Sequence, residues 1–133
     1  MKAFVGHSFH DKDDQLVRAI RDFIESAEIE YITGEQAQNS SVAQKVKDRI
    51  KSCDIFIGIF THDNEVLTTK GLFKGLRGRG KGEEYTTSNW VIQESGFALG
   101  LNKPLILIVE SGIHKFPELQ GDMELIYFTG RGN

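Results

Sequence analysis

Cysteine, proline and long apolar runs are all scarce in this 133-residue sequence. The single cysteine, Cys53, excludes an intramolecular disulfide and a zinc site built from several cysteines. No stretch approaches the ~18 apolar residues of a membrane-spanning helix, and no apolar run near the start has the form of a signal peptide. We therefore expect a cytoplasmic protein without a membrane segment.

Charge of one sign is not in large excess either. Sixteen Lys and Arg stand against nineteen Asp and Glu, which gives a net charge of -3. This balance argues against a dedicated nucleic-acid or membrane-surface binder. Hydrophobic residues make up 39% of the chain, enough for the core of one domain of this length. We expect a single domain over residues 1–133 that needs neither disulfides nor metals to fold.

Apolar periodicity predicts alternating strands and helices. Strands are predicted at 2–5, 28–33, 54–61, 104–109 and 124–128, and helices at 13–25, 41–52 and 88–101. Segments 54–61 and 104–109 are apolar on both faces, which is typical of parallel strands covered by helices. The pattern predicts an α/β fold, a flavodoxin-like three-layer sandwich around a central parallel five-stranded sheet of order 2-1-3-4-5. No helical pattern follows the last strand, which leaves open that the chain is the N-terminal part of a larger protein.

In such a sheet, ligands bind beyond the carboxyl ends of the strands where the strand order reverses, here between strands one and three. The loop after strand one supplies His7, Ser8 and Phe9, and the exit of strand three supplies Phe60 and Thr61. The N-terminal half of the third helix starts at the same edge. We expect these three segments to converge on one crevice.

A carboxylate interrupts the apolar stripe of the third helix. Trp90, Glu94, Phe97 and Leu101 follow one another at positions i, i+4, i+7 and i+11, which places them on one face. Burying an unpaired charge is costly, so Glu94 must be partnered, lie at the edge of that face, or face a cleft. Spacing alone leaves a structural and a functional Glu94 both open.

Two segments resemble TIR domains. Residues 4–13, Phe-Val-Gly-His-Ser-Phe-His-Asp-Lys-Asp, are similar to the first box of that family, a strand ending in a Ser-containing loop before an acidic helix start. Residues 90–94, Trp-Val-Ile-Gln-Glu, resemble the W-x-x-x-E segment of TIR domains that cleave NAD+, in which the Glu is catalytic. The two apolar strands fall in the family's order. His7, the long segment 62–87 and the missing last helix depart from the family pattern.

The resemblance implies an NAD+ glycohydrolase that releases nicotinamide and either ADP-ribose or a cyclic variant. Nicotinamide leaves as a neutral group from a cationic pyridinium, so no acid is required, and a carboxylate at Glu94 can stabilise the developing oxocarbenium charge or attack it. NAD+ is then substrate and not cofactor, and no metal is implied. We expect substrate contacts from residues at the crevice and beside Glu94, namely His7, Ser8, Phe9, Phe60, Thr61 and Trp90.

By the same resemblance, we expect homo-oligomers held by TIR–TIR contacts and a fused or associated sensor domain. Such domains act as immune or anti-phage effectors that self-association activates.

Other interpretations stay open at this point. One is a non-catalytic TIR-type interaction module that assembles through the loop 34–41, and another is a nucleoside deoxyribosyltransferase-like enzyme. A phosphate-accepting receiver domain is disfavoured because Thr61 stands where an Asp is needed. The segment 70–82 carries five basic residues and five glycines, but Gly82 breaks the phosphate-loop pattern. We favour a solvated loop there.

Overall fold

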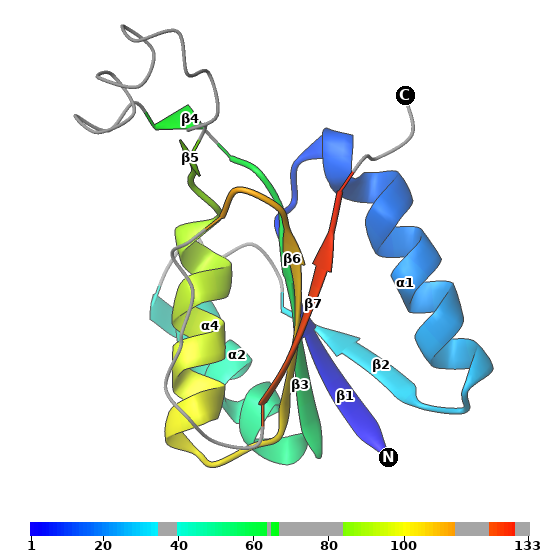
Figure 1. Cartoon of the computed structure of the whole chain (residues 1–133). Coiled ribbons are helices and arrows are strands. Elements are labelled where there is room, and N and C mark those ends of the chain that lie inside the picture. The colour runs from blue at the N-terminus through cyan, green and yellow to red at the C-terminus, as the bar shows by residue number, and fades with distance from the viewer. Residues whose placement is uncertain (35–39, 64, 67–83, 114–122, 130–133) are drawn as a thin grey trace, which may run out of the picture.

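The computed structural model describes residues 1–34, 40–63, 65–66, 84–113 and 123–129. A five-stranded parallel sheet of order β2-β1-β3-β6-β7 lies at its centre (Figure 1). The strands are β1 (Lys2–Gly6), β2 (Glu30–Thr33), β3 (Ile55–Phe60), β6 (Leu105–Glu110) and β7 (Met123–Phe128). The predicted fold class and the order 2-1-3-4-5 are both confirmed.

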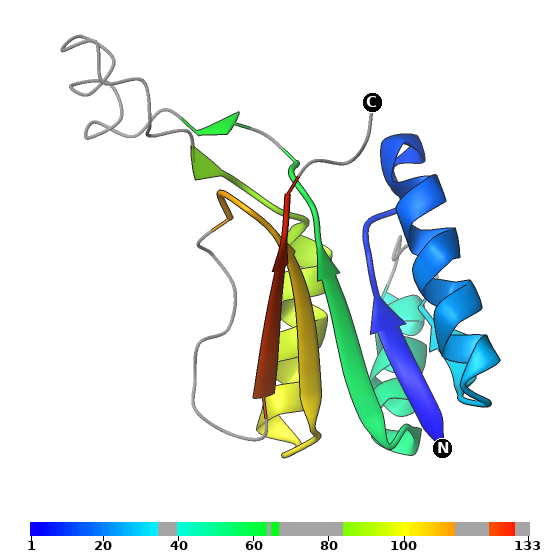
Figure 2. The same cartoon turned by 45° about the vertical axis from the view of Figure 1, so that its right-hand side comes forward.

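Helices cover the sheet on both sides. Figures 1 and 2 show α1 on one side and α2 with α4 on the other. The helices are the short 3-10 turn η1 (Asp11–Asp13), α1 (Asp14–Ser26), α2 (Ser40–Ser52) and α4 (Asn89–Gly100). Each α-helix lies within one residue of its prediction at either end. Of the helices in the described part of the chain, none combines the length and the apolar character that crossing a membrane requires.

Strand alternation divides the core into two clusters. Phe4, Phe56 and Phe60 point toward α2 and α4, whereas Val5 and Ile59 point toward α1. In register, Phe4 stands opposite Phe56, and their rings stack with centroids 5.7 Å apart. The sheet therefore separates two apolar layers, and the cluster under α2 and α4 is the one that carries the site described below.

The single cysteine belongs to the first of these clusters. Cys53 is 2% exposed, and burial raises the pKa of its thiol. Just beside it, Lys103 donates hydrogen bonds to the carbonyl oxygens of Lys51 and Cys53, at 2.9 and 2.8 Å. The end of α2 is thus held to the segment that leads into β6.

The segment 62–87 contains an antiparallel pair that periodicity did not predict, β4 (Glu65–Val66) with β5 (Glu84–Tyr85). The ring of Tyr85 stacks on His62, with centroids 3.7 Å apart and planes 7° from parallel. The Tyr85 amide donates to the Gly112 carbonyl oxygen at 3.0 Å. Both ends of the segment are therefore anchored near the exits of β3 and β6, while the predicted glycine-rich loop 70–82 lies outside the described residues.

The α1 side of the sheet is covered incompletely. A groove of about 310 Å³ runs between α1 and β7, lined by apolar side chains that include Phe23, Ile106, Ile108 and Ile126. Phe23 is 75% exposed and Ile126 is 48% exposed. This apolar groove and the site described next lie on opposite faces of the sheet.

Candidate active site

Glu94 lies on the face of α4 that packs against the sheet, and only 4% of it is exposed. Its carboxyl group reaches the carboxyl ends of β1 and β2. A Cβ added to Gly6 would come within 2.8 Å of Oε1, and one added to Gly34 within 3.1 Å of Oε2. Because the two glycines lack side chains, the carboxyl group fits between α4 and the ends of these strands.

Two buried polar atoms of α4 lack hydrogen-bond partners among the described residues. They are Oε1 of Glu94 and the indole Nε1 of Trp90, one turn earlier. The loss of water around the carboxyl group raises the pKa of Glu94 to about 8. The nearby Trp90 N–H opposes this shift, yet the two groups do not meet in hydrogen-bond geometry. An ionised Glu94 is what the proposed chemistry requires, whereas burial favours its protonated form near neutral pH.

A cavity of about 80 Å³ opens between α2 and α4 beside this carboxyl group. Its lining consists of Ala43, Val46, Lys47, Ile50, Trp90, Gln93, Glu94 and Phe97. The walls are mainly apolar, with a few polar groups that converge on them, as is typical of ligand sites. Of the predicted site residues, Glu94 and Trp90 both line this cavity.

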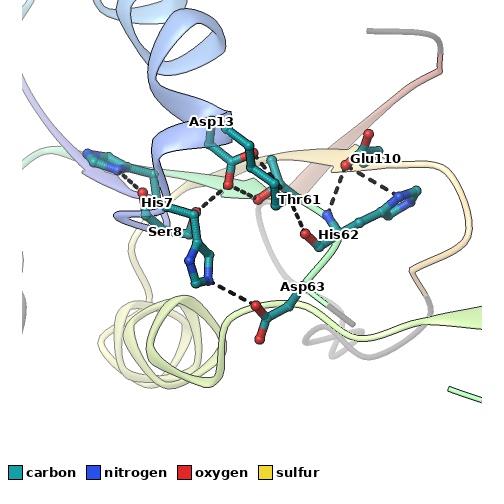
Figure 3. A network of polar contacts seen from close by, with 9 residues as sticks. His7, Ser8, Asp13, Thr61, His62, Asp63 and Glu110 are labelled. Atoms are coloured by element: carbon teal, nitrogen blue, oxygen red, sulfur yellow. Dashed lines mark hydrogen bonds and ion pairs between the residues drawn. The ribbon is translucent and has the colours of Figure 1, made fainter. Parts of the chain in front are cut away.

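A buried polar cluster joins the loop after β1 to the exit of β3 (Figure 3). Ser8 Oγ and Thr61 Oγ1 both donate hydrogen bonds to Oδ2 of Asp13, the second at 2.7 Å. Asp13 is 1% exposed, and Lys12 Nζ lies 3.5 Å from its other oxygen. The structure therefore brings Ser8 and Thr61 together, as the sheet order leads one to expect, and Asp13 is the residue that links them.

The other predicted residues of this edge differ in their surroundings. His7 connects the loop to β2, because its Nε2 lies 3.2 Å from Thr33 Oγ1. Its ring also packs on Phe9, with centroids 4.9 Å apart, and Phe9 is 40% exposed. Phe60 has no exposed surface, because strand alternation turns it into the core beneath α4. Its predicted substrate contact stays a prediction.

Sequence reasoning missed several polar pairs at this edge. His10 Nε2 lies 2.9 Å from Asp63 Oδ1, and the His62 amide donates to Glu110 Oε1 at 2.8 Å (Figure 3). No sequence signal reveals them, since each pair joins segments far apart in the chain. These groups do not assemble into a metal site, because the described residues contain no cluster of three or more His, Cys, Asp or Glu suited to a metal ion.

Sequence comparison identifies the family. Residues 2–128 match the model described as the TIR domain of the CAP12/Pycsar effector protein. The chain belongs to this family. The resemblance of residues 4–13 and 90–94 to bacterial TIR domains is thereby confirmed. No curated protein sequence matches this TIR domain.

Two solved structures share the fold of this TIR domain. A CMP N-glycosidase of Clostridium botulinum is 17% identical, with a TM-score of 0.60 over 96% of this chain and 89% of its own. A 2-deoxyribosyltransferase of the psychrotolerant bacterium Bacillus psychrosaccharolyticus is 14% identical, with a TM-score of 0.53 over 90% of this chain and 87% of its own. At such low identity the likeness shows the fold alone.

Proposed function

We propose that this TIR domain is an NAD+ glycohydrolase that breaks the bond between nicotinamide and ribose, with Glu94 as the catalytic residue. The observation that carries the proposal is the buried Glu94 carboxyl group, whose Oε1 has no hydrogen-bond partner among the described residues beside a cavity. A purely structural Glu at this depth would be expected to have its polar atoms paired. Family membership adds support, since Glu94 ends the W-x-x-x-E segment.

The raised pKa of Glu94 suits a cationic substrate. A positive charge within about 4–6 Å favours the ionised carboxylate and lowers its pKa. Binding of the ribose brings the pyridinium charge close to Glu94 and therefore drives its proton into solvent, and the carboxylate then faces the sugar. As the bond to nicotinamide breaks, its electron pair goes to the ring nitrogen, and the negative charge of Glu94 stabilises the oxocarbenium ion left on the ribose.

Trp90 and Glu94 supply a donor and an acceptor one helical turn apart. A ribose hydroxyl offers one hydrogen-bond acceptor and one donor, the two partners that Trp90 Nε1 and Glu94 Oε1 lack. A cavity of about 80 Å³ is also smaller than the ~150 Å³ space that holds benzene. These facts favour an edge of the sugar in the cavity, with the remainder of the dinucleotide outside it.

A nucleoside deoxyribosyltransferase-like or N-glycosidase activity on other nucleotides is the second candidate, because two enzymes with such names share the fold. A neutral base departs as an anion unless an acid protonates it. Among the described residues that line the cavity, Glu94 is the one carboxyl group, and it cannot serve as acid and stabilising anion at once. A leaving group that needs no protonation, such as nicotinamide, therefore fits the cavity better.

The proposal is tested by incubating concentrated protein with NAD+ and following nicotinamide release by chromatography. Glu94→Gln keeps the shape and removes the charge, and we expect it to abolish release. Glu124→Gln, an exposed residue of β7, is the matched control and should retain it. Equal release by wild type and Glu94→Gln would remove Glu94 from the mechanism.

Parallel incubations address the alternatives. Absence of release from every variant, even after artificial clustering, would favour a non-catalytic interaction module. Cleavage of CMP or of deoxynucleosides in place of NAD+ would favour the second candidate. The same chromatograms identify the product as ADP-ribose or its cyclic form.

The regulation that we expect also belongs to this proposal. We expect the domain to act as an immune effector in which self-association, driven by an associated sensor, switches on NAD+ cleavage. The domain alone should then be weakly active when dilute, and its rate per molecule should rise with protein concentration.

A further inference from the structure

Lys47 of α2 shares the cavity with Glu94. It is exposed, it contributes to the cavity lining, and its Nζ lies 5.9 Å from the centre of the Phe97 ring. Within the part of the chain that the structure describes, no carboxylate forms an ion pair with it. The ammonium group therefore stands at the cavity with an aromatic ring as its neighbour and, among the described residues, without a carboxylate paired to it.

Two other basic groups on or beside α2 have structural partners. Arg49 donates a hydrogen bond of 2.9 Å to the Thr33 carbonyl oxygen, and Lys103 is bonded to two carbonyl groups at the end of the helix. Gln93, which is also exposed and lines the cavity, adds an amide donor close to Lys47. A cation and a neutral donor at the mouth of an otherwise apolar cavity match the oxygens of an anion.

The cavity lining thus includes a buried ionisable acid and an exposed cation. A complementary ligand carries a positive centre and a negative centre on the same small framework. Pyridinium nucleotides have this form, because the ring nitrogen is bonded to the ribose and a phosphate is attached to the 5′ oxygen of the same sugar. With the ribose edge against Glu94, the phosphate is the part of such a ligand that extends outward.

We propose that Lys47 recognises the 5′-phosphate, so that the cavity selects pyridinium nucleotides over the corresponding nucleosides. The inference rests on the proposed function, since it places the same ribose in the same cavity. It adds a specificity-determining residue on a different helix from Glu94. Nicotinamide mononucleotide and nicotinamide riboside differ by one phosphate. They are therefore the probes that distinguish recognition of a nucleotide from recognition of a nucleoside.

The test measures binding of both probes by titration calorimetry in the Glu94→Gln background, where turnover cannot consume them. We expect the mononucleotide to bind about tenfold tighter than the riboside, as one charge-assisted contact provides. Lys47→Met should remove this preference by weakening the mononucleotide alone, and Lys47→Arg should retain it. Lys45→Met changes an exposed lysine that does not line the cavity, and it should behave like the parent.

The outcomes distinguish this inference from the proposed function. Equal affinity for the two probes, no binding of either, or an unchanged preference in Lys47→Met would each overturn the role of Lys47, whatever the rate of nicotinamide release. A phosphate-dependent affinity that Lys47→Met removes, combined with no release of nicotinamide by wild type, would overturn the enzymatic proposal alone. Thermal melting of each variant confirms that it is folded. A preference for the mononucleotide that weakens with added salt would support an ionic contact.

Discussion

Thr61 donates a hydrogen bond of 2.7 Å to Asp13, although 48 positions separate the two residues in the chain. The same carboxylate oxygen accepts a hydrogen bond from Ser8, so one buried group fastens the exit of β3 to the loop after β1. That loop begins at Gly6, whose backbone lies against the Glu94 carboxyl group. The position of the candidate catalytic acid therefore depends in part on a link that touches no cavity residue.

Asp13→Asn should lower the free energy of unfolding by about 1–3 kcal/mol, because charge-assisted hydrogen bonds to a buried carboxylate are weakened together. Urea denaturation measures the loss. Asp11→Asn, an exposed neighbour in η1, is the control and should have a small effect. Equal stability of the two variants would show that the buried cluster contributes nothing to the fold.

The rate of NAD+ cleavage should rise with pH through the raised pKa of Glu94, about 8 in the free protein. The active form is the carboxylate, so kcat/KM should increase up to that pH and then level off. Substrate charge lowers the pKa in the complex, which should place the rise of kcat at lower pH. A profile from pH 6 to 9.5 measures both, and a kcat/KM that is flat or falls over this range would contradict the role of ionised Glu94.

The free energy of unfolding should fall as pH rises, whereas the rate of NAD+ cleavage should increase. The folded protein holds a proton on Glu94 up to pH of about 8, whereas the unfolded chain releases it near 4.5. Between these values the folded state binds more protons, so this group's contribution to stability falls as pH rises, by at most ~1.4 kcal/mol per pH unit. Glu94→Gln should therefore gain stability relative to wild type from pH 5 to 8, as denaturation curves at each pH can show. A constant difference between the two proteins would rule out the raised pKa, and Glu124→Gln should show no such trend.

Gly6→Ala should damage the site, because the new Cβ would lie 2.8 Å from Glu94 Oε1 and 3.0 Å from a ring atom of Phe56. Crowding of this kind typically costs about 1–3 kcal/mol, and here it would also displace the candidate catalytic carboxyl group. We expect lower melting temperature and reduced nicotinamide release. Gly96→Ala is the control within α4, where an added Cβ meets nothing within 4 Å and helix propensity predicts a gain of about 1 kcal/mol. Normal activity in Gly6→Ala would show that the position of the carboxyl group is not critical.

The fold was predictable because its central strands are apolar on both faces. Segments 54–61 and 104–109 can satisfy that pattern only between two layers of helices, and the observed β3 and β6 occupy them. The same property did not reveal how deeply Phe60 is buried, since periodicity indicates the face of a strand and not the distance of a side chain from solvent. The strands β4 and β5, two residues each, are too short for any periodicity.

The sequence predicts the acidic residue of the candidate site but not the residues that surround it. Glu94 stands out in the sequence because it breaks an apolar stripe. Its raised pKa follows from burial against Gly6 and Gly34, which belong to distant segments. Lys47 gave no signal, because a lysine on an exposed helix face is ordinary in sequence and becomes distinctive only when α2 and α4 enclose a cavity. Contacts between distant segments determine both the pKa of Glu94 and the place of Lys47 at the cavity.

The burial of Cys53 has a practical consequence for studying assembly. It is the one cysteine of the sequence, and its thiol is 2% exposed. A cysteine introduced in place of exposed Phe23 would then be the only thiol that reagents reach readily, and it would lie on the face of the sheet away from Glu94. Bifunctional crosslinkers attached there can join two copies of the domain at a chosen point. The distance between the copies can then be varied chemically while the cavity beside Glu94 keeps its native residues.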